Sequence, residues 1–572
     1  MQTSPSGQLY DTNEPQVSTT RHMHRCLRIQ EVVDIIFQHL ADDQGTWTST
    51  RQSEQALCRL ARTCRAFHEL AIKYIWRDLP RIDVIFAVLP KGVVAYHKER
   101  DRRYMYIRYS AFGEEKERLK AGFQRLRHYS RHVKRINWVR RDEKKRLMHP
   151  AMFRKLYEHE YFIRPLFPNL QEVQLPVISD DPNSTIFYPA LVLSPSVRRI
   201  VLSTPEWEEE SEDEDFEDPE DYLWDAVANR VAGVASTLTS FKVESIAFSD
   251  CFVLIGRRLR VDHILRYFTW MMTTLELDGL VLEGKTFAQL NHLTGLVKLK
   301  VSLVSQQDAE MAALPPLSLC LPSLECLTIN IFVDGPHSKF FQILDAKRLK
   351  RLKLKVFTDD EDDYDPTPLF ISLHHHRRNS GLLLEEIHLT RRHNGNAMSW
   401  DEYVEQPHFV ISEATFAPLL YFPRLTTLRI EPCNSSALDD LALVRLFTAW
   451  PKMQRFELHD ESMKFDERIS LTIGGVQRAL QLTPYLRQLS LRFDGTFLPP
   501  CDEDVCLRLH PLETLNACTS IIEVGTLFAG WLVLHFPNLS QVRSFEKYRE
   551  GLEDSFECGC EDEDERKRLE EY

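Results

Sequence analysis

The sequence contains no long apolar run, although the chain has 572 residues. The longest such run, FAGWLVLHF at 528–536, has about half the length that a helix needs to cross a bilayer. The residues before His22 are rich in Ser, Thr, Pro and Gln and show no apolar stretch behind a positive start, so they predict no secretory signal. We therefore expect a soluble protein of the cytoplasm, the nucleus or both, with no membrane partner.

The twelve cysteines follow no regular spacing. In a long chain of the cytosol or nucleus, this predicts buried thiols instead of disulfides. Cys558 and Cys560 form a C-x-C in an acidic segment, but without a second cysteine pair they predict no zinc site. The motifs G-x-S-x-G, H-E-x-x-H and G-x-G-x-x-G are also absent. The sequence thus predicts no metal and no cofactor.

What the sequence does contain is an apolar pattern of helical period between residues 24 and 79. HRCLRIQEVVDIIFQHL and ALCRLARTCRAFHELAIKYIWRDL flank a polar gap, and in both halves apolar residues recur every two to four positions. Such faces must be buried, and a unit of about sixty residues has little core of its own. Part of this apolar surface is therefore predicted to bind a partner.

At these residues the sequence resembles an F-box, and more closely the F-box-like proteins of basidiomycete-type fungi. The similarity rests on L-x-I-x-E-V, IFQHL, LARTCRAFHELA and IWRDL in that order. Two features depart from the family: Gln30 stands where a proline is usual, and ADDQGTWTSTRQSEQ is a longer gap. The alternative is a pair of ordinary core helices in a larger helical domain.

The resemblance implies that the helices bind a Skp-type adaptor of a cullin ubiquitin ligase. Buried apolar and aromatic anchors dominate such interfaces. The residues expected to form this contact are Leu27, Ile29, Val32, Ile36, Leu40, Leu60, Cys64, Phe67 and Trp76.

From about residue 166 to 545 the chain repeats a short phrase, L-x-x-L-x-L after a Pro or polar residue. Clear copies are FPNLQEVQL, LPSLECLTINI, FPRLTTLRI and TPYLRQLSL. Each phrase predicts a short strand with alternating inward Leu, Ile or Val, and the segments between, such as 437–450 and 474–482, predict backing helices. The predicted fold is α/β: a small all-helical module followed by an irregular leucine-rich-repeat solenoid with a parallel sheet. Unrelated α/β units are the alternative.

The net charge of −13 is distributed unevenly. Residues 91–155 are basic, but Phe123, Leu126, Val133 and Ile136 share one helical face, which favours a solvated helix packed on a core over a nucleic-acid surface. We divide the chain into a disordered N-terminus (1–20), an F-box-like module (21–80), a basic helical linker or first cap (81–165), the repeats (166–545, with a disordered acidic insertion at 205–222) and an acidic tail (546–572).

Two motifs are candidate ligand sites. GLVLEGKT, from Gly279 to Thr286, satisfies the phosphate-binding pattern G-x-x-x-x-G-K-S/T. Its bulky residues between the glycines favour a repeat strand, and tight nucleotide binding that Lys285→Ala abolishes would instead identify a nucleotide-binding enzyme. The histidines of SLHHHRRN have no other ligands at a recognised spacing, so we expect an exposed loop at His374, His375 and His376.

These features together predict a protein that is not an enzyme. We expect the substrate-recognition adaptor of an SCF-type ligase, in which the module binds the Skp-type adaptor and the repeats bind an unknown protein substrate. The alternative is a leucine-rich-repeat scaffold for protein interactions without a ligase role.

Overall fold

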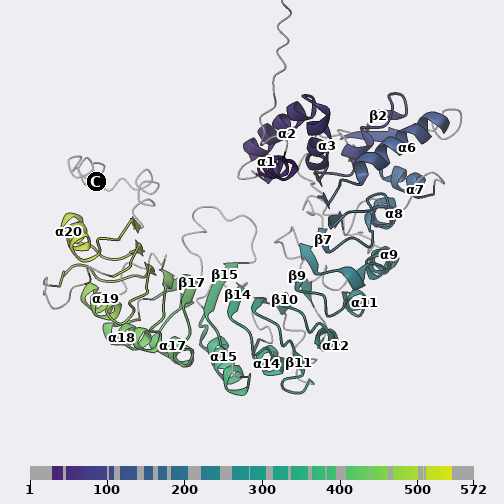
Figure 1. Ribbon diagram of the computed structural model, residues 1–572. Helices are drawn as coiled ribbons and strands as arrows, with labels where there is room; N and C mark the ends of the chain where they lie inside the picture. Colours follow the sequence, from purple (N-terminus) through teal and green to yellow (C-terminus); the bar gives the residue numbers. More distant parts are fainter. Residues whose placement is uncertain are drawn as a thin grey trace, which may run out of the picture.

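The chain folds into a curved solenoid that carries a small helical module near its N-terminus (Figure 1). The computed structural model describes residues 29–42, 47–99, 102–108, 116–137, 147–158, 165–176, 182–203, 221–244, 261–281, 284–303, 314–332, 337–358, 364–380, 383–393, 408–435, 437–460, 468–499, 507 and 510–543. The predicted disordered N-terminus and acidic tail lie outside these ranges, as does the acidic insertion except for residues 221–222.

The backbone of the fold is a sheet of sixteen parallel strands within the described residues. Neighbouring strands follow the order of the chain. β16 (Phe409–Val410) lies outside this order and pairs with β17 (Thr427–Asn434). The order is β1 (Asp78–Leu79), β4 (Arg135–Ile136), β6 (Glu172–Pro176), β7 (Arg199–Ser203), β8 (Ser240–Glu244), β9 (Thr274–Val281), β10 (Lys298–Leu303), β12 (Cys326–Phe332), β14 (Arg351–Thr358), β15 (Glu386–His393), β17 (Thr427–Asn434), β18 (Arg455–Asp460), β19 (Gln488–Ser490), β20 (Thr514–Asn516) and β21 (Gln541–Arg543).

The strands form where the repeated phrase alternates apolar and polar residues. In β12, Leu327, Ile329 and Ile331 are at most 1% exposed and point into the core. The register stacks these positions across the sheet, because Leu327 lies between Leu299 and Leu352. One continuous apolar core therefore runs along the inside of the solenoid.

Helices cover the convex side of the sheet (Figure 1). The segments predicted as backing helices, 437–450 and 474–482, coincide closely with α18 (Asp440–Ala449) and α19 (Ile473–Leu480), so the predicted α/β solenoid with a parallel sheet is confirmed. The covering elements are α8 (Pro182–Val192), α9 (Asp221–Ala232), η2 (Ala235–Thr237), α11 (Val261–Leu265), α12 (Gly284–Gln289), η3 (Leu290–His292), α14 (His337–Ile343), α15 (Thr367–Ser380), α17 (Glu413–Phe416), η5 (Ala417–Tyr421), α18 (Asp440–Ala449), α19 (Ile473–Leu480) and α20 (Gly525–His535), with a short pair of strands, β11 (Leu319–Cys320) and β13 (Leu344–Asp345).

One hydrogen-bond pattern recurs where each strand begins. A carbonyl of one repeat accepts from two successive N–H groups of the next, as the Thr273 carbonyl does from Val297 N at 2.8 Å and Lys298 N at 2.9 Å. The pattern starts at the Arg77 carbonyl, so the repeat geometry begins well before residue 166. The accepting carbonyls belong to Arg77, Lys134, Gln171, Arg198, Thr239, Thr273, Val297, Glu325, Lys350, Glu385, Thr426, Gln454, Arg487 and Glu513.

The basic region 81–165 builds the first turns of the solenoid. α6 (Lys116–Ser130) buries Phe123 and Leu126 against the core, as expected. Val133 and Ile136, expected on the same helical face, are buried in that core too, but they lie beyond the end of the helix, with Ile136 in β4. Unlike the predicted helical linker, this region also contains a hairpin. Its other elements are α4 (Asp83–Phe86), β2 (Val94–Glu99), β3 (Arg102–Ile107), β5 (Leu147–Met148) and α7 (Pro150–Glu158).

The core prediction concerns Trp450, which is fully buried and donates its indole N–H to the Leu419 carbonyl at 3.1 Å. We expect Trp450→Ala to lower the free energy of unfolding of its repeats by about 3–5 kcal/mol, because it leaves a large cavity. The matched control is Trp270→Ala: its side chain is 69% exposed, and a change within about 0.5 kcal/mol is expected. Urea denaturation of the full chain measures both free energies of unfolding. Equal denaturation midpoints for the two variants would contradict the assignment of Trp450 to the core.

Candidate functional site

The N-terminal module is a three-helix unit with its own small core. It consists of α1 (Gln30–Asp42), α2 (Trp47–Ala61) and α3 (Arg65–Ile75). The ring of Phe37 lies at the centre of this core, 2% exposed, with the ring of Phe67 at 5.7 Å and that of Tyr74 at 6.3 Å. The buried residues are Val33, Phe37, Leu57, Ala71 and Tyr74.

A polar contact fixes α1 against α3. Lys73 Nζ lies 3.0 Å from Asp34 Oδ1, and the Tyr74 hydroxyl donates to Asp34 Oδ1 at 3.0 Å and to the Asp34 carbonyl at 3.2 Å. The Lys73 hydrogen bond holds the pKa of the Asp34 carboxyl below its usual value, against the effect of partial burial, and the Tyr74 hydroxyl adds to this. The orientation of α1 on the module is therefore defined by polar contacts as well as by packing.

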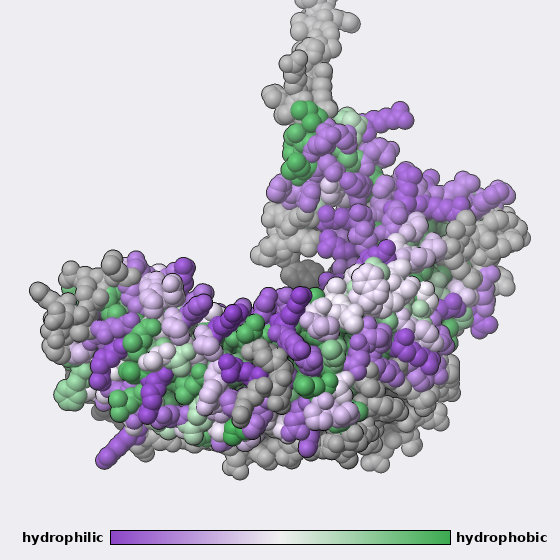
Figure 2. Space-filling view, turned by 60° about the horizontal axis from the view of Figure 1, so that its bottom comes forward, coloured by the Kyte–Doolittle hydropathy of each residue, from purple (hydrophilic) through white to green (hydrophobic). Residues whose placement is uncertain are grey.

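A second apolar face of α1 points to solvent. Ile29 is 50% exposed, Ile35 is 55% exposed and Ile36 is 40% exposed, with half-buried Val32 between them. These four residues, which we call the α1 face, share one side of the helix at spacings of three and four. Figure 2 shows apolar side chains gathered on this module at the top of the molecule. Such a face on a short helix is typical of a docking surface.

The structure places the predicted adaptor-binding residues in different surroundings. Ile29, Val32 and Ile36 belong to the α1 face. Cys64 is half-buried just before α3, and Leu27 lies outside the described residues. The residues that instead pack against the module's own core are Leu40, Leu60 and Phe67.

Trp76 joins the module to the solenoid. Its ring stacks on Tyr129 of α6, with centroids 4.9 Å apart, and it packs against the main core. Two residues later, Asp78 accepts from Arg135 Nη2 at 2.9 Å and from Arg77 Nε at 2.9 Å. The module is thus continuous with the first strands of the sheet.

Ile35 belongs to the α1 face but was not among the predicted residues. The sequence did contain a signal that Ile35 belongs to this face, because Ile35 stands three residues after Val32 and so lies on the same side of the helix. In sequence it cannot be told from the neighbouring core position Val33, because both are β-branched and apolar.

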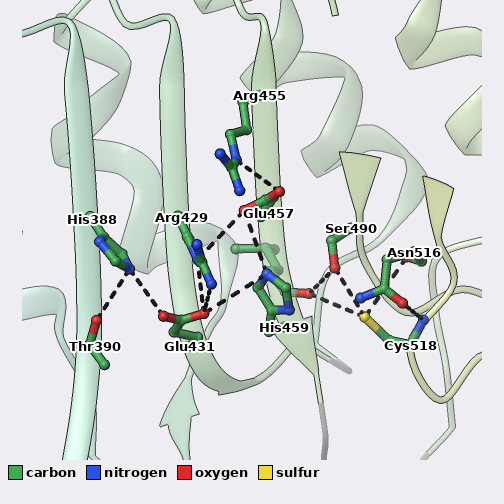
Figure 3. Close-up of polar contacts among 11 residues, drawn as sticks. His388, Thr390, Arg429, Glu431, Arg455, Glu457, His459, Ser490, Asn516 and Cys518 are labelled. Carbon is green, nitrogen blue, oxygen red and sulfur yellow. Dashed lines mark hydrogen bonds and ion pairs between the residues drawn. The ribbon is translucent and has the colours of Figure 1, made fainter. Parts of the chain in front are cut away.

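A polar network lies on the concave face, across β15, β17 and β18 (Figure 3). Glu431 is at its centre: its Oε1 lies 3.1 Å from His388 Nε2, and its Oε2 accepts from Arg429 Nε at 2.8 Å. Glu457 lies beside it, with Oε1 2.8 Å from Arg455 Nε and Oε2 3.5 Å from His459 Nε2. Sequence reasoning missed this network, whose members are widely spaced along the chain.

Both carboxylates of the network are held in the charged form. Burial alone would raise the pKa of Glu431, but the hydrogen bonds from His388 and Arg429 outweigh it and lower the pKa to about 2. Burial likewise opposes the charged form of Glu457, and the contacts with His459 and Arg455 outweigh it and lower that pKa. The network is therefore a set of neutralised charges that stiffens the sheet along its concave face.

A smaller polar cluster lies next along the sheet, at β19 and β20. Ser490 Oγ lies 3.3 Å from Cys518 Sγ, and the Cys518 N–H donates to Asn516 Oδ1 at 3.1 Å (Figure 3). Cys518 has φ = 49°, a left-handed conformation, and its side chain is 5% exposed. We interpret this cluster as the turn that ends the short strand β20.

The segment 279–286 is divided between two elements: residues 279–281 end a repeat strand, as the bulky residues predict, and α12 begins at Gly284. Gly279 and Leu280 lie in β9, and Leu280 is 1% exposed. Thr286 is 2% exposed, whereas the hydroxyl of a phosphate-binding loop must reach the metal and nucleotide. Residues 282–283 lie outside the described ranges.

The exposed loop predicted at the three histidines is wrong. His374, His375 and His376 lie within α15, because Leu369 and Leu373 place an apolar face at helical spacing that includes His376. His376 is 2% exposed, and burial lowers its pKa to about 4. In the described ranges, no group of three or more His, Cys, Asp or Glu side chains is placed to hold a metal ion; Cys558 and Cys560 lie outside them.

None of the described helices has the length and apolar character that crossing a membrane requires. No protein-family model matches the chain, and no curated protein matches it. Among solved structures, the chain is similar to one from the "Crystal structure of Rad7 and Elc1 complex in yeast", at 14% identity, over 65% of this chain and 78% of that chain, with a TM-score of 0.32. A likeness of this degree carries no argument about function.

The network prediction concerns the charge of Glu431. Because its folded pKa lies below the ordinary 4.5, its ionisation stabilises the fold above about pH 4.5, and this contribution is lost as the pH falls toward 2. With 25% of the side chain exposed, solvent screening reduces the effect, and Glu431→Gln is expected to cost about 1–2 kcal/mol at pH 7.

Denaturation midpoints of wild type and Glu431→Gln, compared from pH 7 downward, measure this difference, which should shrink below about pH 4.5. The control is Glu513→Gln, whose exposed pair with Arg487 should contribute nearly nothing. If the difference between the two midpoints does not depend on pH, Glu431 stabilises the fold through its shape and not through its charge.

Proposed function

We propose that the protein is the substrate-recognition adaptor of an SCF-type cullin ubiquitin ligase. In this proposal the α1 face binds a Skp-type adaptor, and the solenoid binds a protein substrate. The protein performs no chemistry itself. It raises the effective concentration of the substrate's lysines beside the ubiquitin-carrying enzyme.

The observation that carries the proposal is the exposed α1 face. The module buries Val33 and Phe37 in its own core, so Ile29, Ile35 and Ile36 are not needed to hold its helices together. About half of each of these side chains is in contact with water, which costs free energy unless a partner covers them. The face lies within the segment that resembles an F-box.

The join between module and solenoid supports the same role. α3 ends at Ile75 and β1 begins at Asp78, so only two residues connect the docking module to the sheet. The stacking of Trp76 on Tyr129 and the Asp78–Arg135 contact hold this join. A substrate on the solenoid would therefore stand at a defined distance from the adaptor, which favours transfer to particular lysines.

The alternative is a repeat scaffold without a ligase role. α1 begins at Gln30, where the family usually has a proline, and ADDQGTWTSTRQSEQ is longer than the corresponding gap in the family. A face altered in this way can retain its exposed isoleucines and bind a different protein. Adaptor binding separates the two functions directly.

The function prediction is that the full chain co-purifies with a Skp-type adaptor in a one-to-one complex, and that Ile29→Asp, Ile36→Asp abolishes it. Placing two carboxylates in a desolvated apolar contact is expected to weaken binding by about a hundredfold or more. Co-expression followed by size-exclusion chromatography and calorimetry measures the complex.

The matched control is Leu527→Asp, Val533→Asp on α20, whose side chains are 63% and 73% exposed at the far end of the solenoid. It adds the same charge to exposed apolar positions and should leave the complex unchanged. Circular dichroism establishes that both variants are folded. A folded wild-type chain that binds no Skp-type adaptor would contradict the proposal and favour the alternative, a repeat scaffold without a ligase role.

A further inference from the structure

Strand β14 presents a row of cations on the concave face. Its inward residues Leu352, Leu354 and Val356 are at most 1% exposed, so the alternate residues point out of the sheet. Those outward residues are Arg351, Lys353 and Lys355, which we call the β14 ladder. Arg351 and Lys353 are exposed, and Lys355 is half-buried.

Charges on the neighbouring part of the face are neutralised within the sheet. Glu276 on β9 lies 2.5 Å from Lys298 Nζ and 3.8 Å from Lys242 Nζ, and Asp278 pairs with Lys300. The network around Glu431 does the same on β17 and β18. By contrast, the side chains of Arg351 and Lys353 form no hydrogen bond or ion pair within the described part of the chain. The ladder is therefore a local excess of positive charge.

The strands beside the ladder do little to offset this charge. The register places Lys353 between Thr328 of β12 and His388 of β15. Glu386 stands next to Arg351 in the register but makes no ion pair with it. A partner that brings carboxylates to this row would meet two cations, Arg351 and Lys353, that pair with no side chain of the described residues.

An aromatic pair lies at the end of the same ladder. The rings of Phe332 and Phe357 are stacked, with centroids 5.0 Å apart and an interplanar angle of 17°. Phe357 follows Lys355 by two residues, so the pair continues the outward row, and Phe332 is half-buried. The row thus changes from charged to apolar along one strand.

We infer that the β14 ladder binds an acidic, extended segment of a partner protein. Residues two apart on a strand are about 6.6 Å apart, so alternate carboxylates of an extended peptide match Arg351 and Lys353, and an apolar residue of the same peptide covers Phe332. The inference rests on the proposed function, because it names the class of substrate that the solenoid would hold.

A nucleic acid fits this surface less well. Single strands bind through bases that stack on accessible rings along a longer basic groove, but Phe332 and Phe357 stack on each other, and Phe357 is only 5% exposed. The cations of the ladder also lie on a single strand.

The test uses the full chain without adaptor and a fluorescein-labelled peptide that alternates glutamate with serine and carries one phenylalanine. Fluorescence anisotropy at low salt should detect binding that weakens as salt is added. Arg351→Glu, Lys353→Glu is expected to weaken binding about tenfold or more, since two attractions become repulsions.

The control variant is Lys347→Glu, Arg348→Glu. Both residues are exposed in the turn before β14, so the variant has the same net charge but leaves the ladder intact, and it should bind as wild type. Equal losses in the two variants, or equal binding of a peptide with glutamine for glutamate, would overturn the inference. So would a wild-type chain that does not bind the peptide, or one that prefers an oligonucleotide.

Adaptor binding is measured on the same ladder variant. Because the α1 face is on a different element, the variant should keep the adaptor, and the Ile29→Asp, Ile36→Asp variant should keep the peptide. The proposed function and the peptide site can therefore fail independently of each other.

Discussion

The pairing of each strand with the one before it is the interaction on which the rest of the structure depends. A single repeat has too little surface to bury its own apolar face; it does so only when its first N–H groups bond the carbonyl of the preceding repeat and its inward residues join the common core. The interval between repeats is uneven, since Thr273 is followed by Val297 but Arg77 by Lys134. Such variation is tolerated because the cost of closing a loop rises slowly with its length.

The same stacking makes the concave face. Parallel strands in register lie about 4.8 Å apart, so outward residues that are distant in sequence become neighbours. His388 contacts Glu431, 43 residues later in the chain, only because β15 and β17 are adjacent. On β14 this arrangement leaves Arg351 and Lys353 without a partner among the described residues. The paired charges around Glu431 and these two cations of β14 are thus different members of one array of outward side chains.

The helical module contributes a surface that the solenoid cannot provide. A strand face is shared between neighbours, whereas a helix on a three-helix unit can bury one side and leave another open. α1 buries Phe37 and exposes Ile36, and Trp76 connects the unit to the main core. Two surfaces of different chemistry, the apolar α1 face and the charged β14 ladder, therefore lie on a single continuous fold; α1 and β14 are labelled in Figure 1.

The sequence by itself determined the repeat strands and their inward faces. The phrase L-x-x-L-x-L places apolar residues at period two, and this pattern alone predicts the parallel solenoid. Only the tertiary structure decided which apolar residues remain open and which polar residues meet. Ile36 and Phe37 are adjacent and equally apolar in sequence, yet one is 40% exposed and the other 2%, and His376 is buried in a helix where a loop was predicted. The physical reason is that periodicity records one face of an element at a time, whereas exposure and pairing depend on which neighbours the fold brings to its other faces.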